Sequence, residues 1–501
     1  MGVYGEFFTK LMTPFFGGLL DILKAFGQGL FKMFNILNYI EVIQKYKKDL
    51  HGVGIVICIF SIVFLLVIFG LIVFLIVKAI KTHIRYRRNV RKEDLLIEEI
   101  ENLNNDIFKL KRQNDKFAEL TNEDGEIEYD EKGNMVNKLK DGESRFFKLT
   151  EVDKKYENYT PEEIINDFDL NKLCEDFRNY SASKLGLYYD IKLIRLFIAS
   201  LASNKLIILE GISGTGKTSL AYAFGSFIDN ETTVASVQPS WRDSTEIFGY
   251  FNEFTKRFNE TQILTSMYDA QYNDKVYITL LDEMNISRVE YYFAEMLSVL
   301  ELPNKKDWII ELVPNKWDND PKKLDEGKIK IPENMWYIGT INNDDSTFMI
   351  TDKVYDRAMP IAIDDKCEPF EAPVTEACKL SYKYLDSLFV KASKEHPVQE
   401  ENLEKIKLMD RYVIDHFRLA FGNRIVKQLK DFVPAYIACG GDEIDGIDYL
   451  LCHKILRKFE QLNLAYIKDE IDGFISYLEE LFGEDKMPEC KAYLLRLKRT
   501  I

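Results

Sequence analysis

The longest uninterrupted apolar stretch of the chain covers residues 52–77, which carry no charged side chain and consist almost entirely of Ile, Val, Leu and Phe. As a helix with a rise of about 1.5 Å per residue, this stretch would be about 39 Å long, enough to cross a hydrocarbon core of about 30 Å with some tilt. A buried helix of a soluble domain is rarely so uniformly apolar, and a signal peptide would begin closer to the first residue. The pattern therefore predicts a single transmembrane helix.

Basic residues gather on one side of this predicted span. The C-terminal flank has seven within about fifteen residues, namely Lys78, Lys81, Arg85, Arg87, Arg88, Arg91 and Lys92, whereas the N-terminal flank has Lys45, Lys47 and Lys48. Because Lys and Arg near a span accumulate on its cytoplasmic side, we expect the larger, C-terminal part of the chain to lie in the cytoplasm. The same cluster would attract anionic lipid headgroups.

Apolar residues in segments 1–50 and 90–120 recur at steps of three or four, the spacing of one helix face. The first segment is predicted to be amphipathic and to lie in the membrane interface; the alternative is a helical hairpin that packs on itself or on a partner. The second has a heptad seam with a polar Asn114 at a core position, which predicts a coiled-coil stalk; the alternative is a single helix folded back on the globular part. Residues 121–160 are expected to form an acidic linker.

Between residues 161 and 367, apolar runs typical of buried strands alternate with helical periodicity. Helices are expected at 161–202 and 287–301, and strands at 206–209, 232–240, 276–285 and 335–342. Alternating strands and helices predict an α/β fold, with a parallel sheet covered by helices on both faces and ligands at the carboxyl ends of its strands. Residues 368–501 show helical periodicity, which predicts a helical lid and C-terminal helices.

The first of these strands leads directly into GISGTGKT, residues 211–218, which we call the phosphate loop. The pattern G-x-x-x-x-G-K-[ST] between a strand and a helix is typical of nucleoside triphosphate binding. Its glycines let backbone N–H groups curl round a phosphate, Lys217 brings a positive charge to the outer phosphates, and Thr218 can hold Mg²⁺. The residues expected to bind the nucleotide are Gly211, Ser213, Gly214, Thr215, Gly216, Lys217, Thr218 and Ser219.

Polar residues also follow the later strands. Asp282 and Glu283 end an apolar strand, where one carboxylate, Asp282, is expected to act with Thr218 in holding the Mg²⁺ of the nucleotide and the other to orient the attacking water. Asn342 ends the next central strand, where its amide could fix that water. Arg357 follows soon after, and we expect it to neutralise transition-state charge at the nucleotide of a neighbouring subunit.

Composition narrows the choice of partners. The 501 residues carry a net charge of −15, which argues against direct binding of nucleic acid without excluding a local basic groove. The seven cysteines and five histidines have no metal-ligand spacing, so we expect no metal other than the Mg²⁺ of the nucleotide.

In this order, the segments EGISGTGKTS, LLDEMN, IGTIN, VYDRAMPI and AFGNRIVKQL resemble the AAA+ ATPases, in particular the dynein-related branch with the McrB-like and MoxR-like proteins. The resemblance covers about residues 185–464. It implies a ring, expected to be a hexamer, with active sites between subunits. Asn342 is then similar to sensor 1, Arg357 to the finger that acts in trans, and Arg424 to the sensor 2 arginine of the lid. Residues 237–264 resemble the helix-2 insertion, a hairpin that faces the central pore.

The resemblance implies ATP as the nucleotide, and the likeness to the McrB-like proteins makes GTP the alternative. Residues 304–307, NKKD, match a guanine signature of small GTPases, but they follow the predicted helix 287–301 and precede the strand 335–342, the wrong place in the fold for reading a base.

Three functions are compatible with these features. The first is a single-pass membrane ATPase whose ring remodels or drives a protein partner, and it accounts for the span, the stalk and the motifs together. The second is the NTPase subunit of a McrB-like restriction or anti-phage system that acts with a separate nuclease. The third is a non-catalytic nucleotide-binding scaffold, against which the intact pair Asp282 and Glu283 argues.

Overall fold

The computed structural model describes residues 142–160, 164–253, 255–342, 347–462 and 464–499, together with six isolated residues of the N-terminal part. The chain divides into two compact units, Met1–Met135 and Val136–Ile501, and the described ranges belong to the second. The predicted transmembrane helix and coiled coil lie outside the described residues, as does the predicted interfacial segment 1–50 except for isolated positions. Among the residues that are described, no helix combines the length and the apolar character needed to cross a bilayer.

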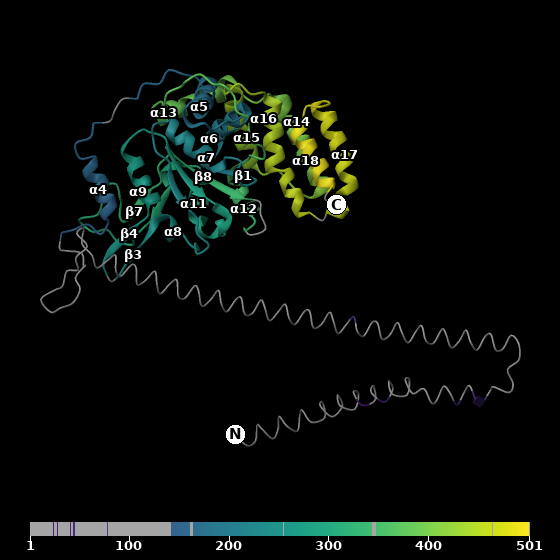
Figure 1. The fold of residues 1–501 in the computed structure, drawn as a ribbon, viewed down its shortest axis with the longest axis horizontal. Coiled ribbons are helices and arrows are strands. Elements are labelled where there is room, and N and C mark those ends of the chain that lie inside the picture. Colours follow the sequence, from purple (N-terminus) through teal and green to yellow (C-terminus); the bar gives the residue numbers. More distant parts are fainter. Residues whose placement is uncertain are drawn as a thin grey trace. The chain divides into compact units, whose positions relative to one another are not determined.

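A five-stranded parallel sheet forms the centre of the second unit (Figure 1). Its strands are β1 (Leu206–Gly211), β2 (Thr233–Ser236), β5 (Tyr277–Asp282), β8 (Met335–Asn342) and β9 (Ala358–Ala362), in the order β2-β5-β8-β1-β9. Gly211 pairs with Asn342, and Ser236 pairs with Asp282, so the carboxyl ends of these strands lie at one edge of the sheet. The predicted α/β fold with a parallel sheet is confirmed.

Apolar side chains alternate along the central strands and build a core on each face of the sheet. In β1, Ile207 and Leu209 belong to the core of one face, whereas Leu206 and Ile208 belong to the core of the other. All four are buried. A strand that is buried on both faces has a continuous apolar sequence, which is why the run LIIL predicts a central strand.

Helices cover both faces. On the face of Ile207 lie α5 (Leu170–Leu185), α6 (Ile191–Ser203) and α7 (Lys217–Phe227); on the other lie α4 (Phe147–Lys155), α9 (Gln262–Asp269), α10 (Val289–Tyr292) and α11 (Ala294–Val299). The helix predicted at 287–301 is divided into α10 and α11, because Phe293 leaves the helical conformation at φ −105° and ψ 7°. Its buried ring packs 5.7 Å from that of Tyr337 in β8.

Two antiparallel hairpins accompany the sheet. One consists of β3 (Gly249–Asn252) and β4 (Arg257–Glu260), follows α8 (Thr245–Phe248), and falls within the predicted insertion 237–264. The other consists of β6 (Ile309–Glu311) and β7 (Lys328–Lys330). Gly249 has φ +102°, and a Cβ there would lie 1.9 Å from the carbonyl oxygen of Asn259, so the hairpin requires glycine at this position.

The end of the predicted linker 121–160 is ordered, which corrects the sequence-based boundary. Arg145 is 3 % exposed and donates hydrogen bonds from Nε and Nη2 to Asp320 at 2.9 and 2.7 Å. The carboxylate of Glu260 in β4 accepts from the backbone N–H of Lys148 at 2.9 Å, at the start of α4. These partners lie more than a hundred residues away in sequence, so local composition does not reveal them.

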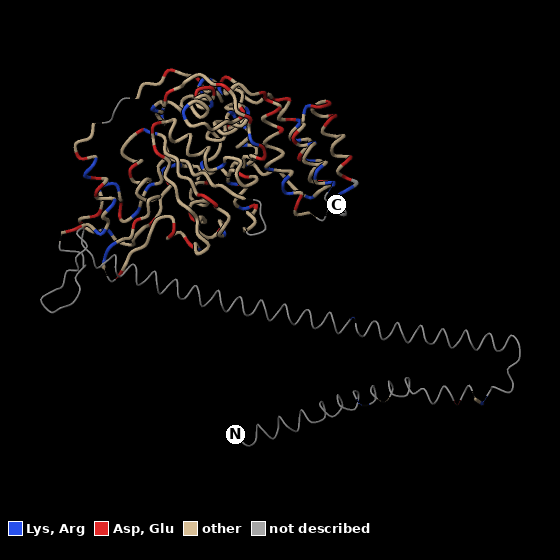
Figure 2. The backbone as a smooth tube through the Cα atoms, in the orientation of Figure 1, with Lys and Arg blue, Asp and Glu red and all other residues tan. Residues whose placement is uncertain are grey.

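The C-terminal part of the chain is helical, as predicted for residues 368–501. Its helices, called the C-terminal helices below, are α13 (Tyr382–Glu395), α14 (Glu400–Phe417), α15 (Asn423–Ala438), α16 (Glu443–Lys454), α17 (Leu464–Phe482) and α18 (Pro488–Arg499). Helices α14, α17 and α18 lie together at the opposite end of the described unit from α4 and the β3–β4 hairpin (Figure 1). Acidic and basic residues are interspersed along them (Figure 2).

Candidate functional site

The phosphate loop makes a tight turn between β1 and α7. Three of its glycines have positive φ, Gly211 at 143°, Gly214 at 81° and Gly216 at 96°. A Cβ at Gly211 would lie 2.3 Å from the carbonyl oxygen of Ile363, so a larger residue does not fit there. The first N–H groups of α7 have no partner within the helix and are available to an anion at this turn.

Lys217, the first residue of α7, folds over the loop. Its Nζ donates hydrogen bonds to the carbonyl oxygens of Gly211 at 3.0 Å and Ile212 at 2.7 Å. Burial lowers the pKa of Lys217 from its ordinary value, and the carboxylates of Asp282 and Asp364 oppose this effect. The ammonium therefore lies in a position where an additional anion would be favourable.

Asp282 joins three elements at the carboxyl edge of the sheet. Its Oδ1 accepts hydrogen bonds from the hydroxyl of Thr218 in α7 and from the hydroxyl of Thr340 in β8, both at 2.7 Å. Thr340 in turn accepts from the backbone N–H of Glu283 at 2.9 Å. Glu283 has φ +53°, and its side chain is exposed at this edge. The two motifs predicted from sequence are therefore in direct contact.

Asn342 ends β8, the strand that lies between β1 and β5. Its backbone carbonyl accepts a hydrogen bond from Nδ2 of Asn285 at 2.9 Å, and Asn285 also donates to the hydroxyl of Thr347 at 2.9 Å. Asn285 is 4 % exposed and follows the acidic pair by two residues. It thus ties the segment after β5 to the end of β8, a positioning role that sequence reasoning missed.

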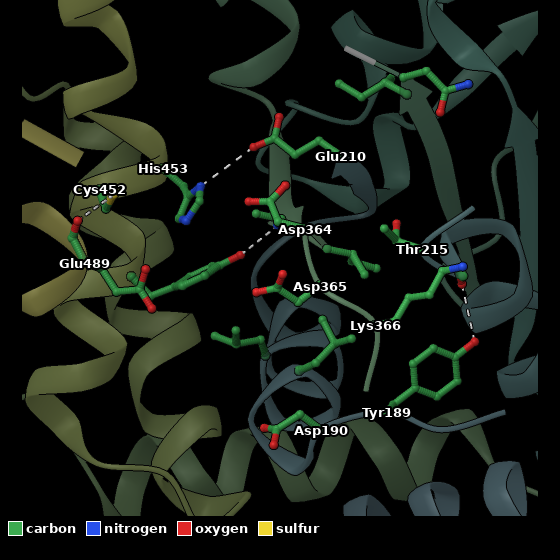
Figure 3. A pocket seen from close by; sticks show the side chains of 18 of the residues that line it. Tyr189, Asp190, Glu210, Thr215, Asp364, Asp365, Lys366, Cys452, His453 and Glu489 are labelled. Carbon is green, nitrogen blue, oxygen red and sulfur yellow. Dashed lines mark hydrogen bonds and ion pairs between the residues drawn. The ribbon is translucent and has the colours of Figure 1, made fainter. Parts of the chain in front are cut away.

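A cavity of about 1100 Å³ adjoins the phosphate loop. Figure 3 shows it between Thr215 and Tyr189 on one side and His453 and Glu489 of the C-terminal helices on the other. The Tyr189 hydroxyl donates to the carbonyl of Gly216 at 3.3 Å, and Asn342 lines the same cavity. The cavity is large enough for a nucleoside as well as its phosphates.

Glu210 links the base of the phosphate loop to the C-terminal helices. It accepts hydrogen bonds from Arg457 at 2.8 Å and from the hydroxyl of Tyr355 at 3.0 Å, and His453 Nδ1 lies 3.7 Å away. Burial alone would raise its pKa, but His453 and the charge of Arg457 outweigh burial and lower the pKa of Glu210 to about 2. Sequence reasoning missed this cluster; the signal was a carboxylate inside the apolar run before Gly211.

Arg357 and Arg424 do not lie at the phosphate loop of their own chain. Arg357 precedes Ala358, which pairs with Leu206 at the start of β1, whereas the phosphate loop follows the end of this six-residue strand. The distance along the strand is about 17 Å at about 3.3 Å per residue, more than an arginine side chain spans. Both arginines pair with Glu301, Arg357 through Nε at 2.6 Å. The structure therefore groups them with each other at the opposite edge from their own loop.

The remaining predicted residues are in the loop and the first turn of α7, where Ser213 is exposed and Ser219 is half-buried. Thr218 and Asp282 offer a hydroxyl and a carboxylate, the hard oxygen ligands that Mg²⁺ prefers. Within the described part of the chain, no group of three or more His, Cys, Asp and Glu side chains is placed to hold a metal ion.

Chemically, the edge of the sheet combines an ammonium, the first N–H groups of α7, a hydroxyl, two carboxylates and an amide beside one cavity. This set can bind a polyphosphate and place a carboxylate next to it as a general base. No family model matches the chain, and no curated protein matches it either.

Proposed function

We propose that the chain is a membrane-anchored AAA+ ATPase that hydrolyses ATP in a ring of identical subunits, with its catalytic domain in the cytoplasm, to remodel or drive a protein partner. The observation that carries the proposal is the 2.7 Å contact between Thr218 and Asp282, since it joins the phosphate loop to the acidic pair 64 residues later in the chain. A shared site for a triphosphate, a divalent cation and a water molecule needs this contact.

Each residue at the carboxyl edge of the sheet would have a separate role in phosphate cleavage. The loop N–H groups and Lys217 would bind the phosphates, with Lys217 leaving the carbonyls of Gly211 and Ile212 for the incoming anion. Glu283, exposed at the edge, would accept a proton from the attacking water, and Asn342 would orient that water. Thr218 and Asp282 would hold Mg²⁺, which neutralises phosphate charge when bound with the nucleotide.

The position of Arg357 supports a site completed by a second subunit. Because Arg357 lies at the opposite edge of the sheet from its own phosphate loop, it can reach a γ-phosphate only in another copy of the chain. Arg424 shares Glu301 with it, so we propose that the two arginines are presented to the neighbour together, rather than Arg424 acting on its own subunit's nucleotide.

The test compares three forms of the full-length chain in detergent. Wild-type protein should hydrolyse ATP, and Glu283→Gln should lower turnover by at least about a hundredfold while ATP binding and assembly remain. Glu404→Gln, which neutralises an exposed carboxylate on α14, is the matched control and should behave as wild type. Competition with GTP measures nucleotide preference. Wild-type protein that neither hydrolyses nor binds either nucleotide would overturn the proposal.

A further inference from the structure

Helix α16 and the 3₁₀ helix that follows it (Leu456–Gln461) contact two segments that bear on the proposed function. His453 and Arg457 face Glu210 and line the cavity beside the phosphate loop. One residue further along in each case, Lys454 and Lys458 face the segment 355–358 that contains Arg357. The same short stretch of chain therefore touches both the nucleotide cavity and the arginine that would serve the next subunit.

Lys454 holds the backbone on both sides of Arg357. Its Nζ donates hydrogen bonds to the carbonyl oxygens of Tyr355 at 2.7 Å, of Asp356 at 3.3 Å and of Ala358. An ammonium group has three N–H donors, and all three acceptors here belong to one short segment. The residue is 3 % exposed, so water is not available to replace these hydrogen bonds.

Other side chains hold the same segment in place. Gln428 of α15 donates to the carbonyl of Asp356 at 3.2 Å, and Lys458 pairs with the carboxylate of Asp356 at 2.8 Å. From the side of the sheet, Asn204 donates to the carbonyl of Arg357 at 2.9 Å. The backbone of Arg357 is thus fixed from several directions, while its guanidinium extends to Glu301.

We propose that Lys454 is a positioning residue for Arg357, and that α16 thereby couples the nucleotide cavity of one subunit to the arginine that this subunit presents to its neighbour. The proposal rests on the function proposed above, in which Arg357 acts on the next subunit's site. A nucleotide in the cavity would lie against His453 and Arg457, and a shift of α16 would move the carbonyls that Lys454 holds. Without Lys454, these buried carbonyls lose their common donor and Arg357 is displaced.

The first experiment measures ATP turnover of full-length Lys454→Met, which removes the ammonium and keeps an unbranched side chain. We expect kcat to fall by about a hundredfold, the effect of a small misplacement of a catalytic group. KM for ATP should change by less than about twofold, because each subunit's own phosphate loop is intact. Lys391→Met, which removes an exposed lysine from α13, is the matched control and should retain wild-type turnover. Loss of ATP affinity with unchanged kcat would overturn the proposal.

Mixed assemblies separate positioning from general loss of structure. Lys454→Met subunits keep an intact nucleotide site, and Glu283→Gln subunits keep an intact Arg357, so mixing the two inactive forms should restore turnover. Arg357→Ala mixed with Glu283→Gln is the reference. Recovery with Arg357→Ala but not with Lys454→Met would overturn the role of Lys454 and leave the proposed function in place. No recovery in either mixture would instead count against the arginine acting between subunits.

Lys458→Met provides a second variant if Lys454→Met fails to fold, as judged by circular dichroism and thermal unfolding. It removes the ion pair with Asp356 through a side chain that is 19 % exposed, at less risk to the core. We expect the same recovery on mixing with Glu283→Gln after a smaller fall in kcat. Wild-type turnover in Lys458→Met, where Lys454→Met does not fold, would overturn the proposal.

Discussion

At the scale of single residues, the contribution of Lys217 to nucleotide binding depends on the groups that surround its ammonium. Its hydrogen bonds to two loop carbonyls compensate a buried ammonium only in part, and a triphosphate would compensate it further. We expect Lys217→Ala to weaken binding of a non-hydrolysable ATP analogue by roughly a hundredfold, about 3 kcal/mol, the upper range for hydrogen bonds to charged groups. Isothermal titration calorimetry on the full-length chain measures this, with Lys391→Ala as control. Equal affinities would refute the role of Lys217.

Glu210 gives a pH-dependent prediction. Since its folded pKa of about 2 lies below the ordinary value of 4.5, it stabilises the fold fully above pH 4.5, and this contribution disappears as the pH falls toward 2. The difference corresponds to about 3 kcal/mol at neutral pH. Glu210→Gln should therefore lower the thermal midpoint at pH 7, and the gap to wild type should narrow in acid. A constant gap from pH 7 to pH 3 would contradict the ion-pair account, and Glu404→Gln serves as control.

Among the predicted site residues, those that the structure brings together belong to local motifs. Lys217 and Thr218 follow the first strand, and Asp282 ends another apolar strand, so a parallel sheet with ligands at the carboxyl ends of its strands predicts that they share one edge. Glu210 and Arg457 are 247 residues apart, and no local pattern connects them. Nor does the sequence show that Arg357 and Arg424 meet on Glu301, since that contact depends on which edge each segment reaches.

At the scale of elements, the order of the strands determines which polar residues lie next to one another at the carboxyl edge of the sheet. Sequence patterns predict parallel strands but not that β8 lies between β1 and β5, since order depends on crossovers that pass over the sheet. The position of β8 brings Asn342 and Thr340 between the phosphate loop and the acidic pair. Packing also overrides local pattern in two predicted elements, the helix divided at Phe293 and the linker that ends in α4.

Gly339 tests how tightly β8 packs against the segment that carries Glu283. A Cβ at Gly339 would lie 2.2 Å from Sδ of Met284, the residue after Glu283, and Met284 is fully buried. We expect Gly339→Ala to destabilise the fold by about 1–3 kcal/mol and to lower turnover, because Met284 must move. Thermal unfolding and ATP hydrolysis measure both effects.

The control for this packing prediction is Gly422→Ala, where an added methyl group has no heavy atom within 4 Å. Its thermal midpoint should stay close to that of wild type. If Gly339→Ala also keeps the wild-type midpoint and turnover, the close contact between β8 and Met284 does not constrain the acidic pair.

At the scale of the whole molecule, the chain divides into two compact units, residues 1–135 and 136–501. The second contains the complete edge with its phosphate loop and acidic pair, and it presents Arg357 at the opposite edge. The proposed activity therefore requires at least two copies of the second unit, whereas attachment to a membrane is a property predicted for the first.

Removing residues 1–92 tests whether the first unit attaches the chain to the membrane. If the uncharged stretch 52–77 spans the membrane as predicted, each of its CH₂ groups would favour the membrane by about 0.8 kcal/mol, so its loss should release the chain into the supernatant after centrifugation of lysed cells. Removing residues 1–50 alone is the matched control, because it takes away the predicted interfacial segment and keeps the span; this form should stay in the membrane pellet after a high-salt wash. If the chain without residues 1–92 still pellets with washed membranes, its attachment lies in residues 93–501. If the chain without residues 1–50 is released, the amphipathic segment, and not the apolar stretch, is the anchor.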